Sequence, residues 1–238
     1  MLIKFFRSSF LIQYFFLVLI TAVVWIPGFL ANPGLPEEPS LITPLYNLAY
    51  YILRMWEPAG PAAAVAMVLI SALTLNNILV FHDLTPKNNI LPAFLFMLFM
   101  AGNPHALSSY PLILALPFLT WFLHTIYKMN DEPENYMEVF NASILIAVIS
   151  MIYPSAVILF IFIWMTLLVY GIFNGRNLII SVIAFILPFF YLFLYFFWTD
   201  QVENALTTYA DYFRHLFNFI LNKEVLQLVI WSIFIIFM

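Results

Sequence analysis

The sequence predicts an all-α integral membrane protein, a polytopic transmembrane helical bundle with about eight crossings. Hydrophobic residues make up 65% of the 238 positions and charged residues only 8%, whereas a soluble domain carries roughly 25% charged residues. The apolar residues also gather in runs near the length of about 20 residues that a spanning helix needs. A soluble chain of this size could not hide so much apolar surface in one core. The whole chain, 1–238, is therefore interpreted as a single membrane domain.

In chain order, the predicted spans are residues 9–26, 61–81, 90–101, 110–127, 139–173, 178–198 and 225–238. Lys4 and Arg7 precede the first span as they would in a signal peptide, but the residues that follow Pro27 make a poor cleavage site, so this helix is expected to be retained. The last span stops at Met238 without a polar tail. We expect the natural protein, or its last helix, to extend further.

The segment 139–173 decides the number of crossings. As one straight helix its 35 residues would reach roughly 50 Å, well beyond a hydrocarbon core of about 30 Å. Pro154 lies near its middle, where proline breaks or kinks a helix. Splitting the segment there gives eight crossings, and a single kinked helix gives seven. The distribution of Lys and Arg slightly favours seven, helix length favours eight, and both versions place the N-terminus inside.

Two connecting segments are predicted to hold interfacial amphipathic helices. The loop 28–60 begins with several prolines, after which Thr43 is a plausible N-cap with Pro44 at the first helical position. Apolar residues then form one stripe, and polar or tyrosine residues form the opposite side; these are Leu45, Leu48, Ala49, Ile52 and Trp56 against Tyr46, Asn47, Tyr50, Arg54 and Glu57. The segment 199–224 has the same pattern, and Asp211 is expected to pair with Arg214 or His215.

Candidate functional residues come from polar groups beside the membrane, because no strong catalytic motif is present. Glu37 and Glu38 in the first loop are candidates for a carboxylate base, with a solvated surface pair as the alternative. Arg54 is a candidate for holding a lipid phosphate, or else a rim ion-pair partner of Glu57. His105, in the turn 103–105, could line the same outer cleft or simply be part of a polar turn.

Other polar residues are interpreted as structural. His82 and Asp83 are too few ligands for a metal, so no metal site is predicted, and Asp83 or Thr85 is expected to cap a helix. Asn76, Asn77 and Asn141 are expected to join helices through their amides, and His124 to lie at the interface. The acidic residues of the loop after the fourth span, Asp131, Glu132, Glu134 and Glu138, are expected to be solvated.

Short patterns between Asn76 and Trp198 resemble a family of multi-pass inner-membrane proteins of Bacteroidetes-type bacteria, known only as a domain of unknown function. They are Lys87-Asn88-Asn89-Ile90-Leu91-Pro92, Phe140-Asn141-Ala142, Met151-Ile152-Tyr153-Pro154, Asn174-Gly175-Arg176-Asn177 and Leu187-Pro188-Phe189-Phe190-Tyr191. The resemblance implies the bacterial cytoplasmic (inner) membrane but no activity. The layout is also similar to that of GT-C-type membrane glycosyltransferases, although their acidic residue directly follows helix one, where this chain has Pro27-Gly28-Phe29.

Three hypotheses for function follow. The first is a non-catalytic subunit or scaffold in cell-envelope assembly, with membrane lipid and other membrane proteins as partners. The second is a GT-C-like transferase or lipid-carrier enzyme that acts on a polyprenyl-linked substrate, with Glu37 or Glu38 as base and Arg54 on the phosphate. The third is a transporter, which the absence of charge at mid-span disfavours. A net charge of −4 from few groups does not indicate nucleic-acid binding.

Overall fold

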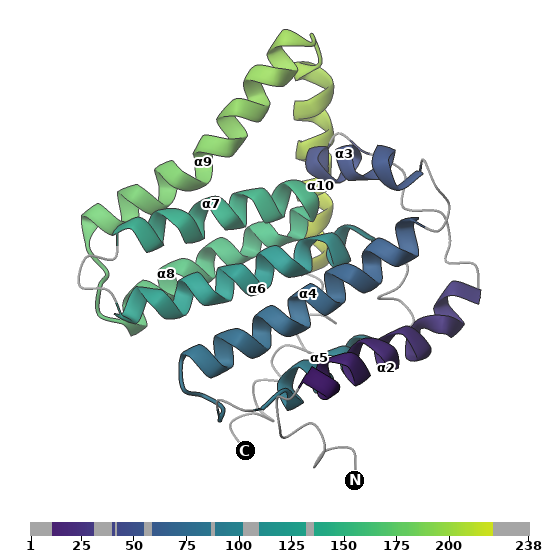
Figure 1. The fold of residues 1–238 in the computed structure, drawn as a ribbon. Coiled ribbons are helices and arrows are strands. Elements are labelled where there is room, and N and C mark those ends of the chain that lie inside the picture. Colours follow the sequence, from purple (N-terminus) through teal and green to yellow (C-terminus); the bar gives the residue numbers. More distant parts are fainter. Residues whose placement is uncertain are drawn as a thin grey trace. The chain divides into compact units, whose positions relative to one another are not determined.

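The computed structural model describes residues 11–30, 40, 42–54, 59–86, 89–101, 110–131 and 136–220, and every regular element among them is a helix (Figure 1). The helices of the first half are α2 (Leu11–Leu30), α3 (Pro44–Arg54), α4 (Ala59–Phe81), α5 (Leu91–Ala101) and α6 (Tyr110–Asp131). Those of the second half are α7 (Tyr136–Ile152), the 3₁₀ helix η2 (Pro154–Ile158), α8 (Leu159–Val169), α9 (Gly175–Trp198) and α10 (Val202–Ile220). The all-α prediction is confirmed for these residues.

Among the described residues, three helical segments are long and apolar enough to cross a membrane: Ala62–Phe81 in α4, Pro111–Asn130 in α6 and Gly175–Trp198, which is α9. The helices α2, α5, α7 and α8 are apolar but contribute shorter stretches. The predicted spans 61–81, 90–101 and 178–198 agree with the observed helices to within three residues at each end. The predicted last span, 225–238, lies outside the described residues.

The contacts of the chain divide it into two units, Met1–Phe189 and Phe190–Met238, with the boundary inside α9. In the first unit the main core gathers around α7, and ten of the 17 residues of α7 are buried. Many of these residues are small, including Ala142, Ser143, Ala147 and Ser150. Small side chains let neighbouring helix backbones approach closely, as they do in membrane helix bundles.

The chain reverses direction at Pro154, as the split of segment 139–173 predicts. Helix α7 ends at Ile152, η2 begins at Pro154, and α8 runs back beside α7 (Figure 1). A cation–π contact agrees with the reversal, because the guanidinium carbon of Arg176 lies 3.8 Å from the ring centre of Tyr136. A straight helix between these positions would hold them tens of ångströms apart.

Helix α3 begins at Pro44 as predicted, but it is oriented differently. Tyr46 and Tyr50, which we assigned to the polar side, are 1% and 8% exposed and pack into the main core, whereas Leu48 is 64% exposed. Tyrosine has an apolar ring, so a tyrosine-rich face can be buried against protein. Asn47 fixes the start of the helix, because its amide nitrogen donates to Ser40 O at 2.6 Å and its oxygen accepts from Ser40 N at 3.0 Å.

In the described part of the chain, three helices end in the same hydrogen-bonded turn. After α4, Leu84 N donates to Leu79 O at 2.9 Å and Asp83 N to Val80 O at 3.2 Å, with Asp83 in the left-handed region at φ 52°. This is the Schellman arrangement, in which glycine is the usual left-handed residue. Gly171 takes that position after α8 and Asp200 after α9. The prediction that Asp83 caps a helix is confirmed, at the C-terminal end.

The motif Asn174-Gly175-Arg176-Asn177 forms the start of α9. Asn174 Oδ1 accepts a hydrogen bond from Asn177 N at 2.8 Å, which is the geometry of an N-cap. The side chain of Asn177 is fully buried, and its amide nitrogen donates to Ile172 O at 2.8 Å. The motif therefore has a local structural role.

Within the second unit, α10 carries the predicted polar face. Glu203, Thr207, Asp211 and Arg214 are exposed. Arg214 Nη1 lies 3.2 Å from Asp211 Oδ1, which confirms the predicted pair. Leu206, assigned to the apolar face, is 60% exposed and the small Ala205 is buried instead.

Candidate functional site

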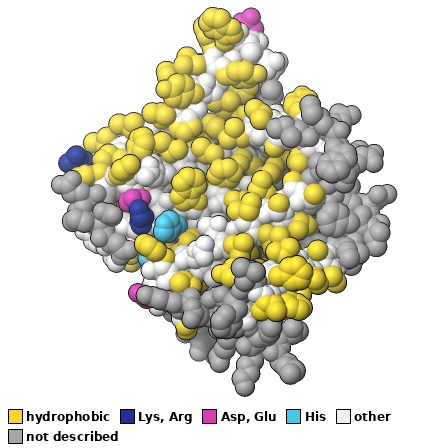
Figure 2. All heavy atoms as spheres, viewed as in Figure 1, with side chains coloured by type: hydrophobic (Ala, Val, Ile, Leu, Met, Phe, Trp, Pro, Cys, Tyr) yellow, Lys and Arg dark blue, Asp and Glu magenta, His cyan; other side chains and the backbone are white. Residues whose placement is uncertain are grey.

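The most polar part of the first unit lies where α6 ends and α7 begins. Lys128 Nζ on α6 is 3.5 Å from Glu138 Oε1 in the first turn of α7. The Glu138 side chain is only 13% exposed and that of Lys128 is 39% exposed. The expectation that Glu138 is merely solvated is therefore wrong, because folding of the α6–α7 hairpin brings it against a lysine. Figure 2 shows a small group of basic, acidic and histidine side chains within a mostly hydrophobic surface.

A pocket of about 710 Å³ opens between the same two helices. Its polar lining consists of His124, Thr125, Lys128, Glu138 and Asn141, and its apolar walls include Trp121 and Leu145. The volume lies in the range of roughly 300–1,000 Å³ that is usual for small-molecule sites, and such sites combine apolar walls with a few converging polar groups. We call this cavity the α6–α7 pocket.

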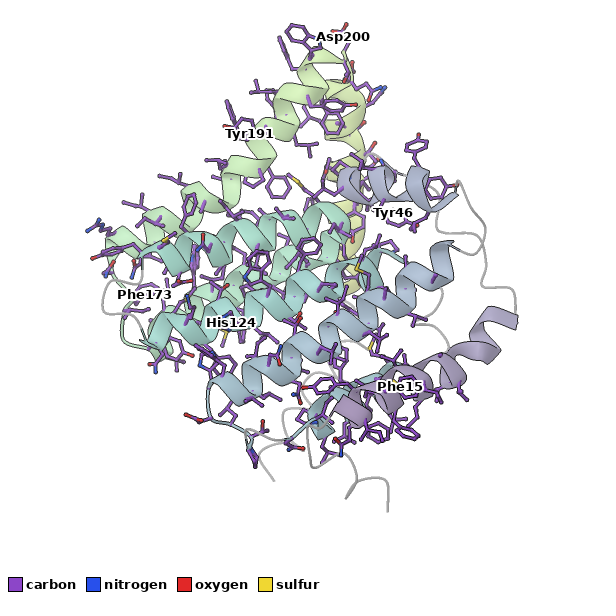
Figure 3. The ribbon with its side chains drawn as sticks, viewed as in Figure 1. Phe15, Tyr46, His124, Phe173, Tyr191 and Asp200 are labelled. Carbon is purple, nitrogen blue, oxygen red and sulfur yellow. The ribbon has the colours of Figure 1, made fainter. Side chains whose placement is uncertain are left out.

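His124 connects the α6–α7 pocket to an aromatic cluster at the end of α4 (Figure 3). Its ring centre lies 5.6 Å from that of Phe81 and 5.7 Å from that of His82, and His82 lies 5.0 Å from Tyr127. Nδ1 of His124 is shielded from solvent and meets no hydrogen-bond partner within the described part of the chain. In folded proteins a shielded polar atom of this kind is usually met by an ordered water.

The predicted outer cleft cannot be assembled from the described residues. Glu37, Glu38 and His105 lie outside them. Arg54 is the last residue of α3, and its side chain is likewise outside the description. The predicted roles of these four residues stay predictions. Among the described residues, no group of three or more His, Cys, Asp or Glu side chains is placed to hold a metal ion.

A second feature of interest is the apolar face formed by α8 and the first part of α9, which we call the α8–α9 face. The two helices are joined by a hydrogen bond from Trp164 Nε1 to Ser181 Oγ at 3.1 Å and by Phe160 and Phe185, whose ring centres are 4.4 Å apart. Outward from this seam the side chains are large and open; they are Ile161, Met165, Leu168, Ile179, Ile183 and Ile186, each between 53% and 62% exposed.

His124, Asn141 and Glu138 were interpreted separately from the sequence and were not expected to line one cavity. A weak signal was present, since Lys128 and Glu138 flank a short polar loop between two predicted spans. If the spans pack as an antiparallel hairpin, residues at equal distance from the loop face each other. That signal predicts a neighbour pair but not a pocket, because the pocket depends on how far the two helices diverge.

Comparison of the sequence with protein-family models and with curated proteins, and of the fold with solved structures, finds no match.

Proposed function

We propose that the chain is a multi-pass protein of the bacterial cytoplasmic membrane, with its N-terminus inside and about eight crossings, that serves as a non-catalytic subunit or scaffold in envelope assembly. One observation carries the proposal. Helix α9 buries its polar and small residues Asn177, Ser181 and Ala184, while Ile183 and Ile186 point outward. A helix in water has the opposite arrangement.

The physical reason is that lipid is as apolar as a protein interior. In a bilayer, large aliphatic side chains lose nothing by facing outward, and hydroxyl and amide groups gain by facing another helix. The hydroxyls of the bundle follow this rule by bonding to their own helix, as when Ser143 donates to Val139 O at 2.8 Å and Thr166 to Phe162 O at 2.9 Å. No water is needed to satisfy them.

The subunit role rests on the breadth of the α8–α9 face. Only four of the 24 residues of α9 are buried, and α8 adds Ile161 and Met165 on its own outer side. The two helices are linked by the Trp164–Ser181 hydrogen bond and together form an apolar wall. Such a wall suits the helices of another membrane protein as well as lipid.

Site-specific photocrosslinking in intact membranes tests both parts of the proposal. A photoreactive residue would replace Ile183 or Ile161 on the α8–α9 face, with Ile70 on α4 as the control, because Ile70 is similarly exposed at 49%. We expect lipid adducts at all three positions and one discrete protein adduct at Ile183 and Ile161 only. Release of the chain by alkaline carbonate would refute the membrane location, and protein adducts that are absent, or equal at Ile70, would refute the subunit role.

The transferase hypothesis makes a different prediction. If Glu37 or Glu38 is a base and Arg54 and His105 hold the phosphate of a polyprenyl-linked substrate, Glu37→Gln or Glu38→Gln abolishes turnover while the crosslinks from Ile183 persist. The subunit proposal instead predicts that these substitutions leave complex formation and envelope assembly intact. Within the described residues, no contact supports the transporter hypothesis. Transport of a solute into proteoliposomes that contain the protein would be evidence for it.

A further inference from the structure

The α6–α7 pocket presents two opposite charges side by side. Lys128 and Glu138 both line it, and their charged atoms are 3.5 Å apart. A close charge-assisted hydrogen bond is about 2.7–2.9 Å long. The observed separation therefore leaves both groups able to take further partners. Lys128 is part-exposed and Glu138 lies deeper.

We propose that this pocket binds the headgroup of a zwitterionic phospholipid of the phosphatidylethanolamine type, with the phosphate at Lys128 and the ammonium at Glu138. The charges of the lining sum to zero when His124 is neutral. A purely anionic headgroup would meet the carboxylate of Glu138, and a purely cationic one would meet Lys128. A ligand that carries both charges matches both residues.

Neutral polar groups in the lining fit the same ligand. His124 lines the pocket one helical turn before Lys128 and offers a neutral imidazole as a polar partner. The carboxamide of Asn141 adds a donor and an acceptor close to Glu138 in the lining. A primary ammonium has three N–H donors for such acceptors, whereas the quaternary ammonium of choline has none.

The walls of the pocket suit acyl chains. Trp121 and Met137 are 57% and 71% exposed, and Leu145 continues the apolar surface along α7. The polar lining residues of α6 lie toward the C-terminal end of the apolar stretch Pro111–Asn130. A tryptophan next to charged groups at the end of an apolar helix is typical of headgroup depth. A lipid can therefore place its headgroup in the pocket and its chains along α6 and α7.

The inference rests on the membrane location proposed above but not on the subunit role. Its test is native mass spectrometry of the full chain, purified in detergent and titrated with synthetic phosphatidylethanolamine, phosphatidylcholine and phosphatidylglycerol. We expect phosphatidylethanolamine to bind with a defined stoichiometry and ahead of the other two. Glu138→Gln should weaken the binding of phosphatidylethanolamine about tenfold, the effect of one charge-assisted hydrogen bond, and should leave the binding of phosphatidylglycerol unchanged. Lys128→Gln should weaken the binding of both lipids.

The matched control is Asp211→Asn, which removes the acid of the exposed Arg214–Asp211 pair on α10 and should leave lipid binding unchanged. If Glu138→Gln does not fold, the unmodified chain can instead be labelled with a photoreactive phosphatidylethanolamine. The label should then concentrate on peptides that contain Trp121 or Met137. Equal binding of the three lipids, unchanged selectivity in Glu138→Gln, or labelling spread evenly over α8 and α9 would overturn the proposal. Saturation of the pocket by soluble phosphorylethanolamine would overturn the lipid assignment. None of these results depends on carbonate extraction, which tests the membrane location separately.

Discussion

The reversal at Pro154 predicts which loops share a side of the membrane. The Arg176–Tyr136 contact at 3.8 Å places the start of α9 beside the start of α7. The 17 residues of α7 reach about 25 Å, and η2 plus α8 reach about 26 Å. Each arm is close to a hydrocarbon core of about 30 Å. We therefore expect the chain to cross and return, with Phe173 on the same side as Asp83, and with Ile158 and Glu203 on the other.

Single cysteines at these four positions test the prediction. The sequence contains no cysteine, so the unmodified chain is a blank, and all four side chains are exposed. A membrane-impermeant maleimide would be added to spheroplasts and to inverted vesicles. We expect Asp83→Cys and Phe173→Cys to react only in inverted vesicles, and Ile158→Cys and Glu203→Cys only in spheroplasts. Reaction of Phe173→Cys and Asp83→Cys from opposite sides would refute the reversal and restore the seven-crossing version.

Three further predictions concern stability and can be measured by reversible unfolding in mixed micelles. Asp83 occupies a left-handed position at φ 52°. The free energy of unfolding of Asp83→Gly should therefore stay within about 1 kcal/mol of the unmodified chain, while Asp83→Val should lose about 1–2 kcal/mol. Equal losses would contradict the cap assignment. Asn177→Ala removes the donor to Ile172 O and should lower the free energy of unfolding by about 1–3 kcal/mol. The control is Asn77→Ala on an exposed surface, which should lower it little. Similar losses for the two variants would show that the buried amide is unimportant. Ala142→Leu places a larger side chain in a fully buried site and should lower the free energy of unfolding by about 1–3 kcal/mol. The same change at the exposed Ala66 should leave it nearly unchanged. A larger loss at Ala66 than at Ala142 would contradict the assignment of the core.

The positions of the helices could be predicted because long apolar runs, bounded by polar residues, can be seen in the sequence itself. The predicted span 61–81 and the observed α4 both end at Phe81, where the polar residues His82 and Asp83 follow. Similarly, the break at Pro154 follows from the missing amide hydrogen and the fixed φ of proline. These are local properties, so a single sequence is sufficient to predict them.

The faces of the helices were harder to predict. In water, hydrophobic residues indicate the buried side, but in lipid both sides of a helix are apolar and that signal disappears. In α3 the error had another cause: Tyr46 and Tyr50 were counted as polar, although their rings are apolar and buried, and the leucines face outward. The pair Lys128–Glu138 was missed for a related reason, since its formation depends on helix packing across a loop and not on the pattern of one segment.

The short helices of the bundle follow from what surrounds them. Backbone that is not helical is tolerated at membrane depth only where protein covers it or where its polar groups are satisfied. The turn between α7 and α8 meets both conditions: Pro154 is buried, Ala156 is 5% exposed, and Ala156 N donates to Tyr153 O at 3.0 Å. Because the turn is covered, α7 and α8 need not each reach 20 residues to be stable in a bilayer. A turn that is covered in this way could also stop short of the far surface of the bilayer. Labelling of Ile158→Cys distinguishes the two cases, because the maleimide reacts in spheroplasts only if the turn reaches that surface.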